Sequence, residues 1–109
     1  MPTTYKVLGQ AAPSATTATT LYTVPSATST VVSTISVCNR DSASAQYRVA
    51  VRPAGATLAN SQYIVYDASL TGNSTDTLTV GITLAATDVI TVYASTANFT
   101  FSAFGSELS

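Results

Sequence analysis

The stretch Gln46-Tyr47-Arg48-Val49-Ala50-Val51-Arg52 decides the fold class. Apolar and polar side chains alternate along it, with Tyr47, Val49 and Val51 forming the apolar set. A period of two is typical of a β-strand with one buried and one solvated face. Pro53 follows at once and ends the strand, because proline has no N–H for the hydrogen-bond ladder. The stretch therefore predicts a strand with its three apolar side chains inward and its two arginines outward.

Further segments of strand composition lie on both sides of it, separated by turn residues such as Gly72-Asn73. They are 5–8, 21–24, 29–38, 63–66, 77–84, 88–94 and 99–103. About eight short strands at this spacing predict an all-β fold, an antiparallel β-sandwich of Greek-key or jelly-roll type. The length of 109 residues fits a single domain over 1–109.

Two of these segments carry more detailed expectations. In 77–84 the inward set is Leu78, Val80, Ile82 and Leu84. The three residues 85–87 separate it from 88–94, so we expect the two segments to form a hairpin.

The segment 29–38 has apolar residues of both parities. Its spacing puts Val31, Ile35 and Val37 on one face and Val32 and Cys38 on the other. We therefore expect this strand to be covered on both sides.

Charge is scarce in this chain. It has 4 Lys and Arg and 5 Asp and Glu, for a net charge of −1, and no charged side chain occurs over the 33 residues Val7–Asn39. So few cations exclude binding to nucleic acid through phosphates, and Ser or Thr interrupts every apolar run that could span a membrane. Low net charge promotes association, so we expect the chain to be a homo-oligomer.

The low-complexity stretch Gln10–Thr20 is either a long surface loop or an arm that lies on a neighbouring subunit. Because it contains no charge, we expect Pro13, Thr16 and Thr17 to contact a partner. Arg48 and Arg52 are the other candidate contacts. They lie on one strand face about 13 Å apart, either solvated or making a bidentate contact with a partner's carboxylates.

Tyr47, Tyr63, Tyr66 and Tyr93 could form a sugar-stacking surface. Alternation places Tyr47 with the apolar set, however, and this favours the core or a subunit interface for these rings. A carbohydrate-binding β-sandwich that recognises host glycans is kept as a distant alternative function.

Catalytic chemistry lacks its usual residues. The chain has no His and a single Cys38, so neither a zinc site nor a nucleophile with a histidine base is available. A calcium site could be formed by Asp67, Asp76 and Asp88, or each of them could cap a turn. Turn capping is preferred because no local motif of acidic ligands is present. We expect no enzyme, no metal and no cofactor, and we expect Cys38 to be a half-buried free thiol.

Several phrases, in order and spacing, resemble small virion structural proteins of tailed bacteriophages. They are Leu21–Pro25, Ser36–Arg40, Val49–Pro53, Tyr63–Asp67, Leu84–Ser95 and Phe104–Glu107. The resemblance covers about residues 20–108. It implies a β-sandwich that assembles on the phage particle in multiple copies and has no catalytic residues.

The chain departs from these proteins at two turns. Thr87 stands where they often have glycine, and Pro25-Ser26-Ala27 stands where they often have Pro-Ala-Gly. Both departures concern the shape of a turn.

We therefore expect a capsid decoration (cement) protein, located in the virion and assembled in the host cytoplasm. It would bind the outer shell as a trimer, with itself and the major capsid protein or other virion proteins as partners. A trimer that bridges shell subunits makes several weak contacts act together. A tail, collar or fibre subunit is the alternative within the same class.

Overall fold

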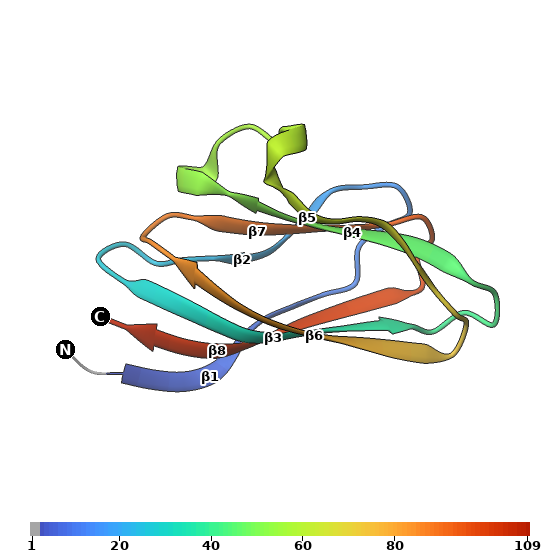
Figure 1. Ribbon diagram of the computed structural model, residues 1–109, viewed down its shortest axis with the longest axis horizontal. Helices are drawn as coiled ribbons and strands as arrows, with labels where there is room; N and C mark the ends of the chain where they lie inside the picture. The colour runs from blue at the N-terminus through green and yellow to red at the C-terminus, as the bar shows by residue number, and fades with distance from the viewer. Residues whose placement is uncertain (1–2) are drawn as a thin grey trace.

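The computed structural model describes residues 3–109, with only the backbone of Val80. Eight strands form two antiparallel sheets packed face to face (Figure 1). The first sheet contains, in order, β1 (Thr3–Ala11), β8 (Phe99–Leu108), β3 (Ser29–Asn39) and β6 (Ser74–Leu84). The second sheet contains, in order, β2 (Thr19–Thr23), β7 (Val89–Ala94), β4 (Ala45–Arg52) and β5 (Tyr63–Leu70).

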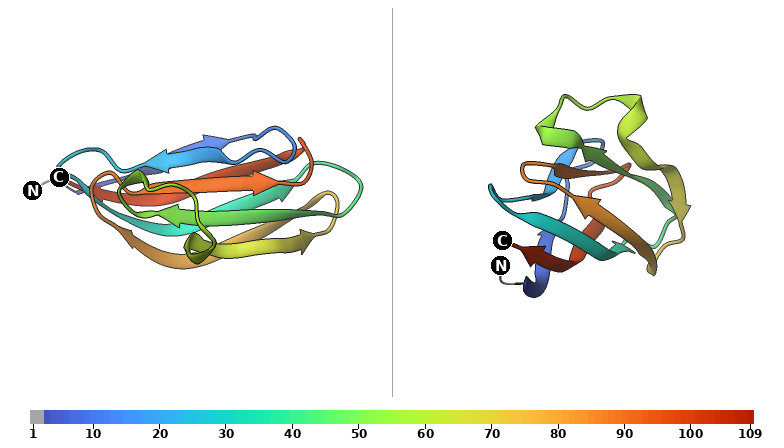
Figure 2. Two further views of the ribbon diagram at one scale, coloured as in Figure 1. Left: turned by 90° about the horizontal axis from the view of Figure 1, so that it is seen from above. Right: turned by 60° about the vertical axis from the view of Figure 1, so that its left-hand side comes forward.

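The strand order identifies an eight-stranded jelly roll. β1 pairs with β8, β2 with β7, β3 with β6, and β4 with β5, as in one long hairpin rolled into two sheets. This confirms the predicted antiparallel sandwich. The molecule measures 45 × 27 × 19 Å, and its strands run along the long axis (Figure 2). The beginning of β1 and the end of β8 lie together at one end (Figure 1).

The core between the sheets is filled by the residues that alternation points inward. Tyr47, Phe99 and Phe101 are buried, and their ring centroids lie 6.0 to 6.2 Å apart. Ile35 and Ile90 enter the same cluster from opposite sheets. Full burial of a large apolar side chain contributes about 1.5–3 kcal/mol, so this cluster is the main attraction between the sheets.

The expected faces of β3 are correct for Ile35 and Val37 but wrong for its first half. Val32 is buried and Val31 is exposed, because Ser33 is an extra residue relative to β8 and reverses the alternation. The Ser33 hydroxyl donates to the Phe104 carbonyl at 3.1 Å and so ties this bulge to the neighbouring strand. The outer side of β3 is open in the chain, so the expected cover on both sides is wrong as well. Cys38 is a free, half-buried thiol, as predicted.

The predicted hairpin of β6 and β7 is also wrong, because these strands belong to different sheets. Between them the chain crosses the sandwich beside Val24. The Thr87 N–H donates to the Val24 carbonyl at 3.1 Å, and the Val24 N–H donates to the Asp88 carbonyl at 2.9 Å. Leu78, Ile82 and Leu84 face inward as expected, and the expected direction of Val80 lies outside the described residues. The alternation of apolar and polar residues shows which face of a strand is buried. The same alternation occurs in two strands that pair within one sheet and in two strands that belong to facing sheets.

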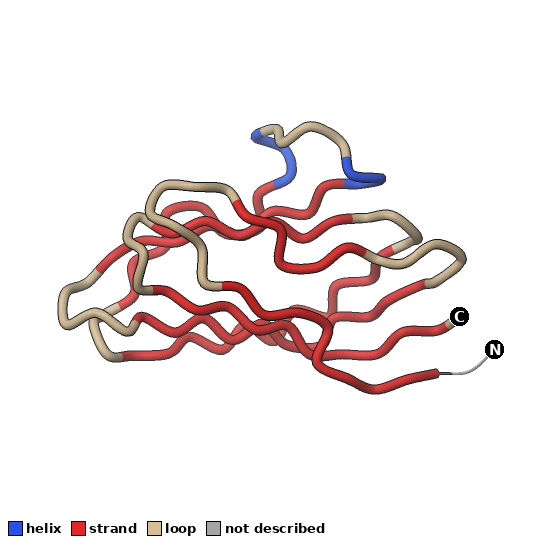
Figure 3. The backbone as a smooth tube through the Cα atoms, turned by 180° about the vertical axis from the view of Figure 1, so that it is seen from behind, coloured by secondary structure: helices blue, strands red, loops and turns tan. Residues whose placement is uncertain are grey.

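One long connection stands above the outer face of the second sheet (Figure 3). It joins β4 to β5 and contains two short 3₁₀ turns, η1 (Pro53–Gly55) and η2 (Asn60–Gln62). Ala50 on the outward side of β4 is only 1% exposed. This connection therefore closes one part of the outer face and leaves the neighbouring part open.

Candidate functional site

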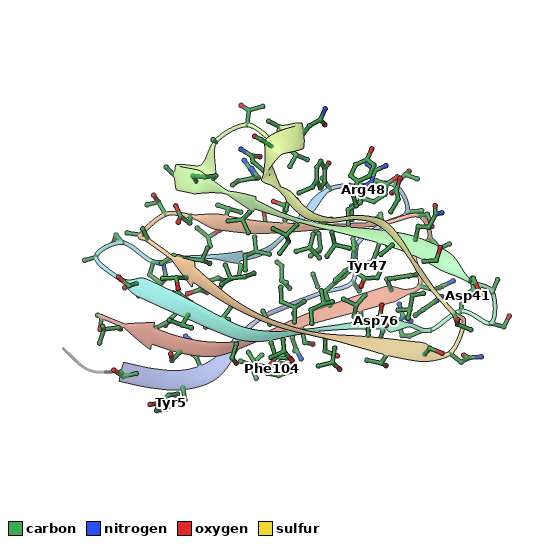
Figure 4. The ribbon with its side chains drawn as sticks, viewed as in Figure 1. Tyr5, Asp41, Tyr47, Arg48, Asp76 and Phe104 are labelled. Carbon is green, nitrogen blue, oxygen red and sulfur yellow. The ribbon has the colours of Figure 1, made fainter. Side chains whose placement is uncertain are left out.

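An apolar strip lies on the outer face of the first sheet. Its side chains are exposed although they are large and hydrophobic: Tyr5, Val7, Val31, Phe104 and Leu108. They come from β1, β8 and β3, which are adjacent in the sheet. Val7 lies opposite Phe104, and Ser106 lies between Tyr5 and Val31 in the next row of the ladder. Figure 4 shows Tyr5 and Phe104 beneath this sheet, pointing away from the core.

The strip continues to an edge of the sheet. β1 is the outermost strand, and Tyr5 on it is 83% exposed. An edge strand presents backbone N–H and C=O groups that a further strand can pair with, so a long apolar edge favours association. The only charged side chain on the described part of β1, Lys6, is paired with Glu107 at 3.1 Å. This edge thus combines apolar side chains with little net charge.

A second candidate surface lies on the outer face of the second sheet, centred on Arg48 (Figure 4). Across the β4–β7 ladder, Arg48 lies opposite Tyr93. On the other side, both Tyr66 and Asp67 fall opposite Arg48, because β5 has a bulge there. Asp67 has a φ of 53°, a left-handed conformation that is uncommon outside glycine. The bulge therefore brings two consecutive side chains to one arginine.

Contacts hold this arginine firmly. Its Nε lies 2.7 Å from Asp67 Oδ1, and its Nη2 lies 3.2 Å from Oδ2, a bidentate pair. Its Cζ lies 4.2 Å from the ring centroid of Tyr66 and 4.3 Å from that of Tyr93, both within cation–π range. The hydrogen bonds from Arg48 lower the pKa of Asp67, and Asp67 raises the pKa of Arg48. The pair is thus fully ionised and mutually neutralised at neutral pH.

Tyr63 completes what we call the tyrosine cluster: Tyr63, Tyr66 and Tyr93 around Arg48 and Asp67. The rings of Tyr63 and Tyr66 meet edge to face, with centroids 4.9 Å apart. Beside them a shallow hollow is lined by Asn60, Tyr63 and Tyr66. Asn60 comes from η2, so the connection between β4 and β5 forms the rim of this hollow.

Arg52, the second predicted contact arginine, holds the same connection in place. Its Nε donates to the Ala56 carbonyl at 2.7 Å, and its Nη2 donates to the Gly55 carbonyl at 3.0 Å. Nη1 lies 3.4 Å from the Thr91 hydroxyl. Arg48 and Arg52 therefore share a strand face as expected, and both are engaged within the chain.

The stretch Gln10–Thr20 contains the end of β1, the start of β2 and the connection between these two strands, which belong to different sheets. It is not an extended arm. Pro13 is buried, whereas Thr16 and Thr17 are exposed. The Thr16 N–H donates to the Ala94 carbonyl at 2.8 Å, which fixes the turn against the end of β7. Contact of the exposed threonines with a partner stays a prediction.

The acidic residues occupy separate places. Asp67 pairs with Arg48, Asp76 accepts a hydrogen bond from Tyr47, and Asp88 accepts bonds from the backbone N–H groups of Ala54 and Ala85. Asp41 accepts from two backbone N–H groups and from the Asn98 amide, which lowers its pKa. Within residues 3–109, no three potential metal ligands lie together.

The sequence placed Tyr47 correctly in the core. It raised Tyr63, Tyr66 and Tyr93 as a sugar-stacking surface but favoured the core or a subunit interface, and it did not predict that they surround Arg48 and Asp67. Tyr63 and Tyr66 are three residues apart, so a regular strand would point them to opposite faces. The irregular register of β5 brings both to Arg48. For Arg48 and Tyr93 the sequence did give an indication, because both residues alternate with buried apolar side chains and are therefore expected on the outward faces of their strands.

Across the described residues, no helix is long and apolar enough to cross a membrane. Comparisons with protein-family models, with curated proteins and with solved structures find no match to this chain.

Proposed function

We propose that this chain is a structural protein of a tailed-bacteriophage virion, a decoration protein that binds the outer shell as a trimer. The observation that carries the proposal is the apolar strip on the first sheet. An apolar patch on one face of a small domain is a feature of interaction surfaces. The resemblance to small virion proteins, which prompted the proposal, gives the class of particle.

The strip supplies the contact between copies. Each Å² of apolar surface removed from water contributes about 25 cal/mol, and low net charge leaves little repulsion between copies. The edge strand β1 adds the option of backbone hydrogen bonds across the interface. The trimer then presents three equal shell-binding surfaces, so contacts that are weak singly become strong jointly.

The shell contact belongs to parts of the protein outside the strip. The connection between β1 and β2, with the exposed Thr16 and Thr17, is our candidate. It is uncharged and held against Ala94, so it can be pressed onto a neighbour at little cost in conformational entropy.

The mass of the purified protein in solution tests the trimer. By light scattering after size exclusion we expect three copies of the 11.2 kDa chain. Val31→Lys and Phe104→Lys place a charge in the strip, and each variant should be a folded monomer. Ile64→Lys is the matched control, because Ile64 is 47% exposed but lies on a strand of the second sheet. A monomeric parent protein, or trimers that survive both strip variants, would overturn the proposed interface.

Binding to the particle tests the rest of the proposal. The trimer should sediment with empty expanded capsids, and a Thr16→Lys, Thr17→Lys double variant should bind more weakly while remaining a trimer. Copy number then separates locations: on the order of hundreds per particle indicates decoration, and about three to twelve indicates tail, collar or fibre. Failure to bind any virion component would overturn the proposal.

A further inference from the structure

The hollow beside the tyrosine cluster has the features of a small ligand site. Tyr66 is 58% exposed although Arg48 lies 4.2 Å from its ring centroid. The cation thus holds the ring without covering it. An aromatic ring fixed in this way, with the exposed amide of Asn60 beside it, offers a flat apolar surface next to a hydrogen-bonding group.

The polar groups of the site match hydroxyl groups and not a charged ligand. Because Arg48 and Asp67 neutralise each other, no free cation is present in the cluster to attract an anion. The Asp67 side chain is 37% exposed, and each of its oxygens keeps a lone pair after the bidentate bond. A ligand hydroxyl can donate to Asp67, and another can exchange hydrogen bonds with Asn60.

The site is also organised before any ligand arrives. The bulge in β5 fixes the backbone of Tyr66 and Asp67, and the ion pair and the edge-to-face contact with Tyr63 fix the side chains. Little conformational entropy remains to be lost on binding.

We propose that this hollow binds a neutral pyranose unit of an oligosaccharide. The C–H face of the sugar ring lies on Tyr66, and its hydroxyls bond to Asp67 and Asn60. A pyranose has an apolar face and a rim of hydroxyls, and this hollow offers the complement of both. The site does not depend on the proposed virion function, because it lies on the sheet opposite the apolar strip.

Titration with four neutral trisaccharides, maltotriose, cellotriose, mannotriose and N,N′,N″-triacetylchitotriose, tests the proposal, with trigalacturonate as the acidic comparison. The ¹H–¹⁵N spectrum of the protein reports the place of binding. At least one neutral trisaccharide should shift the amides of Asn60, Tyr66 and Asp67, and trigalacturonate should not. Tyrosine fluorescence gives a second readout, since the chain has no tryptophan.

Variants assign the binding to the ring. Tyr66→Ala should weaken the affinity about tenfold, as expected for the loss of one aromatic contact. Tyr66→Phe keeps the ring and should stay within about threefold of the parent. Thr79→Ala removes an exposed side chain from β6, on the opposite sheet and outside the apolar strip, and should not change the affinity. Unchanged thermal unfolding of each variant shows that the fold is intact.

Three outcomes would overturn the site. None of the neutral trisaccharides binds at about 10 mM, a concentration that detects even very weak complexes; trigalacturonate binds better than all of them; or the shifts fall on the apolar strip. A trimer that assembles normally but shows one of these outcomes leaves the proposed virion function standing.

Discussion

The Tyr47 hydroxyl donates a hydrogen bond of 3.0 Å to Asp76 Oδ2 and so joins the two sheets of the sandwich. Figure 4 shows both side chains between the sheets. Tyr22 makes the corresponding bond to Glu107 and also contacts the Thr30 hydroxyl at 2.8 Å. In both cases the phenol comes from the second sheet and the carboxylate from the first. These phenol–carboxylate bonds thus join the two sheets in addition to the apolar core.

Replacing Tyr47 by Phe should lower the free energy of unfolding by about 1–2 kcal/mol, because a hydrogen bond to a carboxylate is lost while the ring remains. Denaturant unfolding measures this as a lower midpoint with an unchanged slope. Tyr66→Phe is the control, since Tyr66 is 58% exposed and lies outside the apolar strip, and its stability should not change. Equal stability of Tyr47→Phe and the parent would show that the bridge contributes nothing.

Alkaline pH should weaken the fold. Burial, and then the hydrogen bonds to Asp76 and Glu107, raise the pKa of Tyr47 and Tyr22 to about 12 from the usual 10.0. The unfolded chain therefore loses these protons first, so the stabilisation is complete below pH 10 and is lost as the pH rises towards 12.

Denaturant midpoints measured between pH 8 and 12 test this dependence. The double variant Tyr22→Phe, Tyr47→Phe should start from a lower stability and decline less over this range. A parallel decline of the variant and the parent would attribute the effect to other groups.

Acidic pH should weaken the fold as well, through the protonation of Glu107. The hydrogen bond from Tyr22, and more weakly Lys6, lowers the pKa of Glu107 below its usual 4.5. The carboxylate therefore stabilises the fold above that value, and this contribution is lost as the pH falls through the folded-state pKa. Melting temperatures between pH 2 and 6 should fall less steeply for Glu107→Gln than for the parent. Asp88→Asn serves as the comparison, because Asp88 contacts backbone N–H groups in another part of the fold.

The class of fold was predictable because strands such as β8 keep a period of two over their buried part. Phe99, Phe101 and Ala103 alternate without interruption on β8, and all three are buried. Strand pairing was not predictable, because the pattern of buried residues in a strand does not indicate which of the two sheets the strand belongs to. The hairpin expected for β6 and β7 fails for this reason.

Single extra residues within strands explain why the apolar strip and the tyrosine cluster could not be predicted from the sequence. Ser33 moves Val31 from the core to the apolar strip, and the bulge at Tyr66 and Asp67 assembles the tyrosine cluster. A bulge depends on the fit between two neighbouring strands. Its position therefore follows from tertiary packing and is not visible in the composition of one strand.

Several turns have a non-glycine residue with a positive φ, and two of these residues yield the last prediction. Ala27 has a φ of 55° and Thr87 a φ of 69°. A left-handed conformation costs a residue with a Cβ roughly 1–2 kcal/mol, and part of that is offset because glycine gives a more flexible unfolded chain. Ala27→Gly and Thr87→Gly should each therefore raise the free energy of unfolding by about 0.5–1 kcal/mol.

Denaturant midpoints decide this, and Ala86→Gly is the matched control. Ala86 lies in the same turn as Thr87 but is not among the described residues with a positive φ. Glycine there only adds freedom to the unfolded chain, so this variant should lose about 0.5–1 kcal/mol. If all three glycine variants are destabilised alike, the turns are not strained. If the first two gain while Ala86→Gly loses, backbone strain at these turns is the cause.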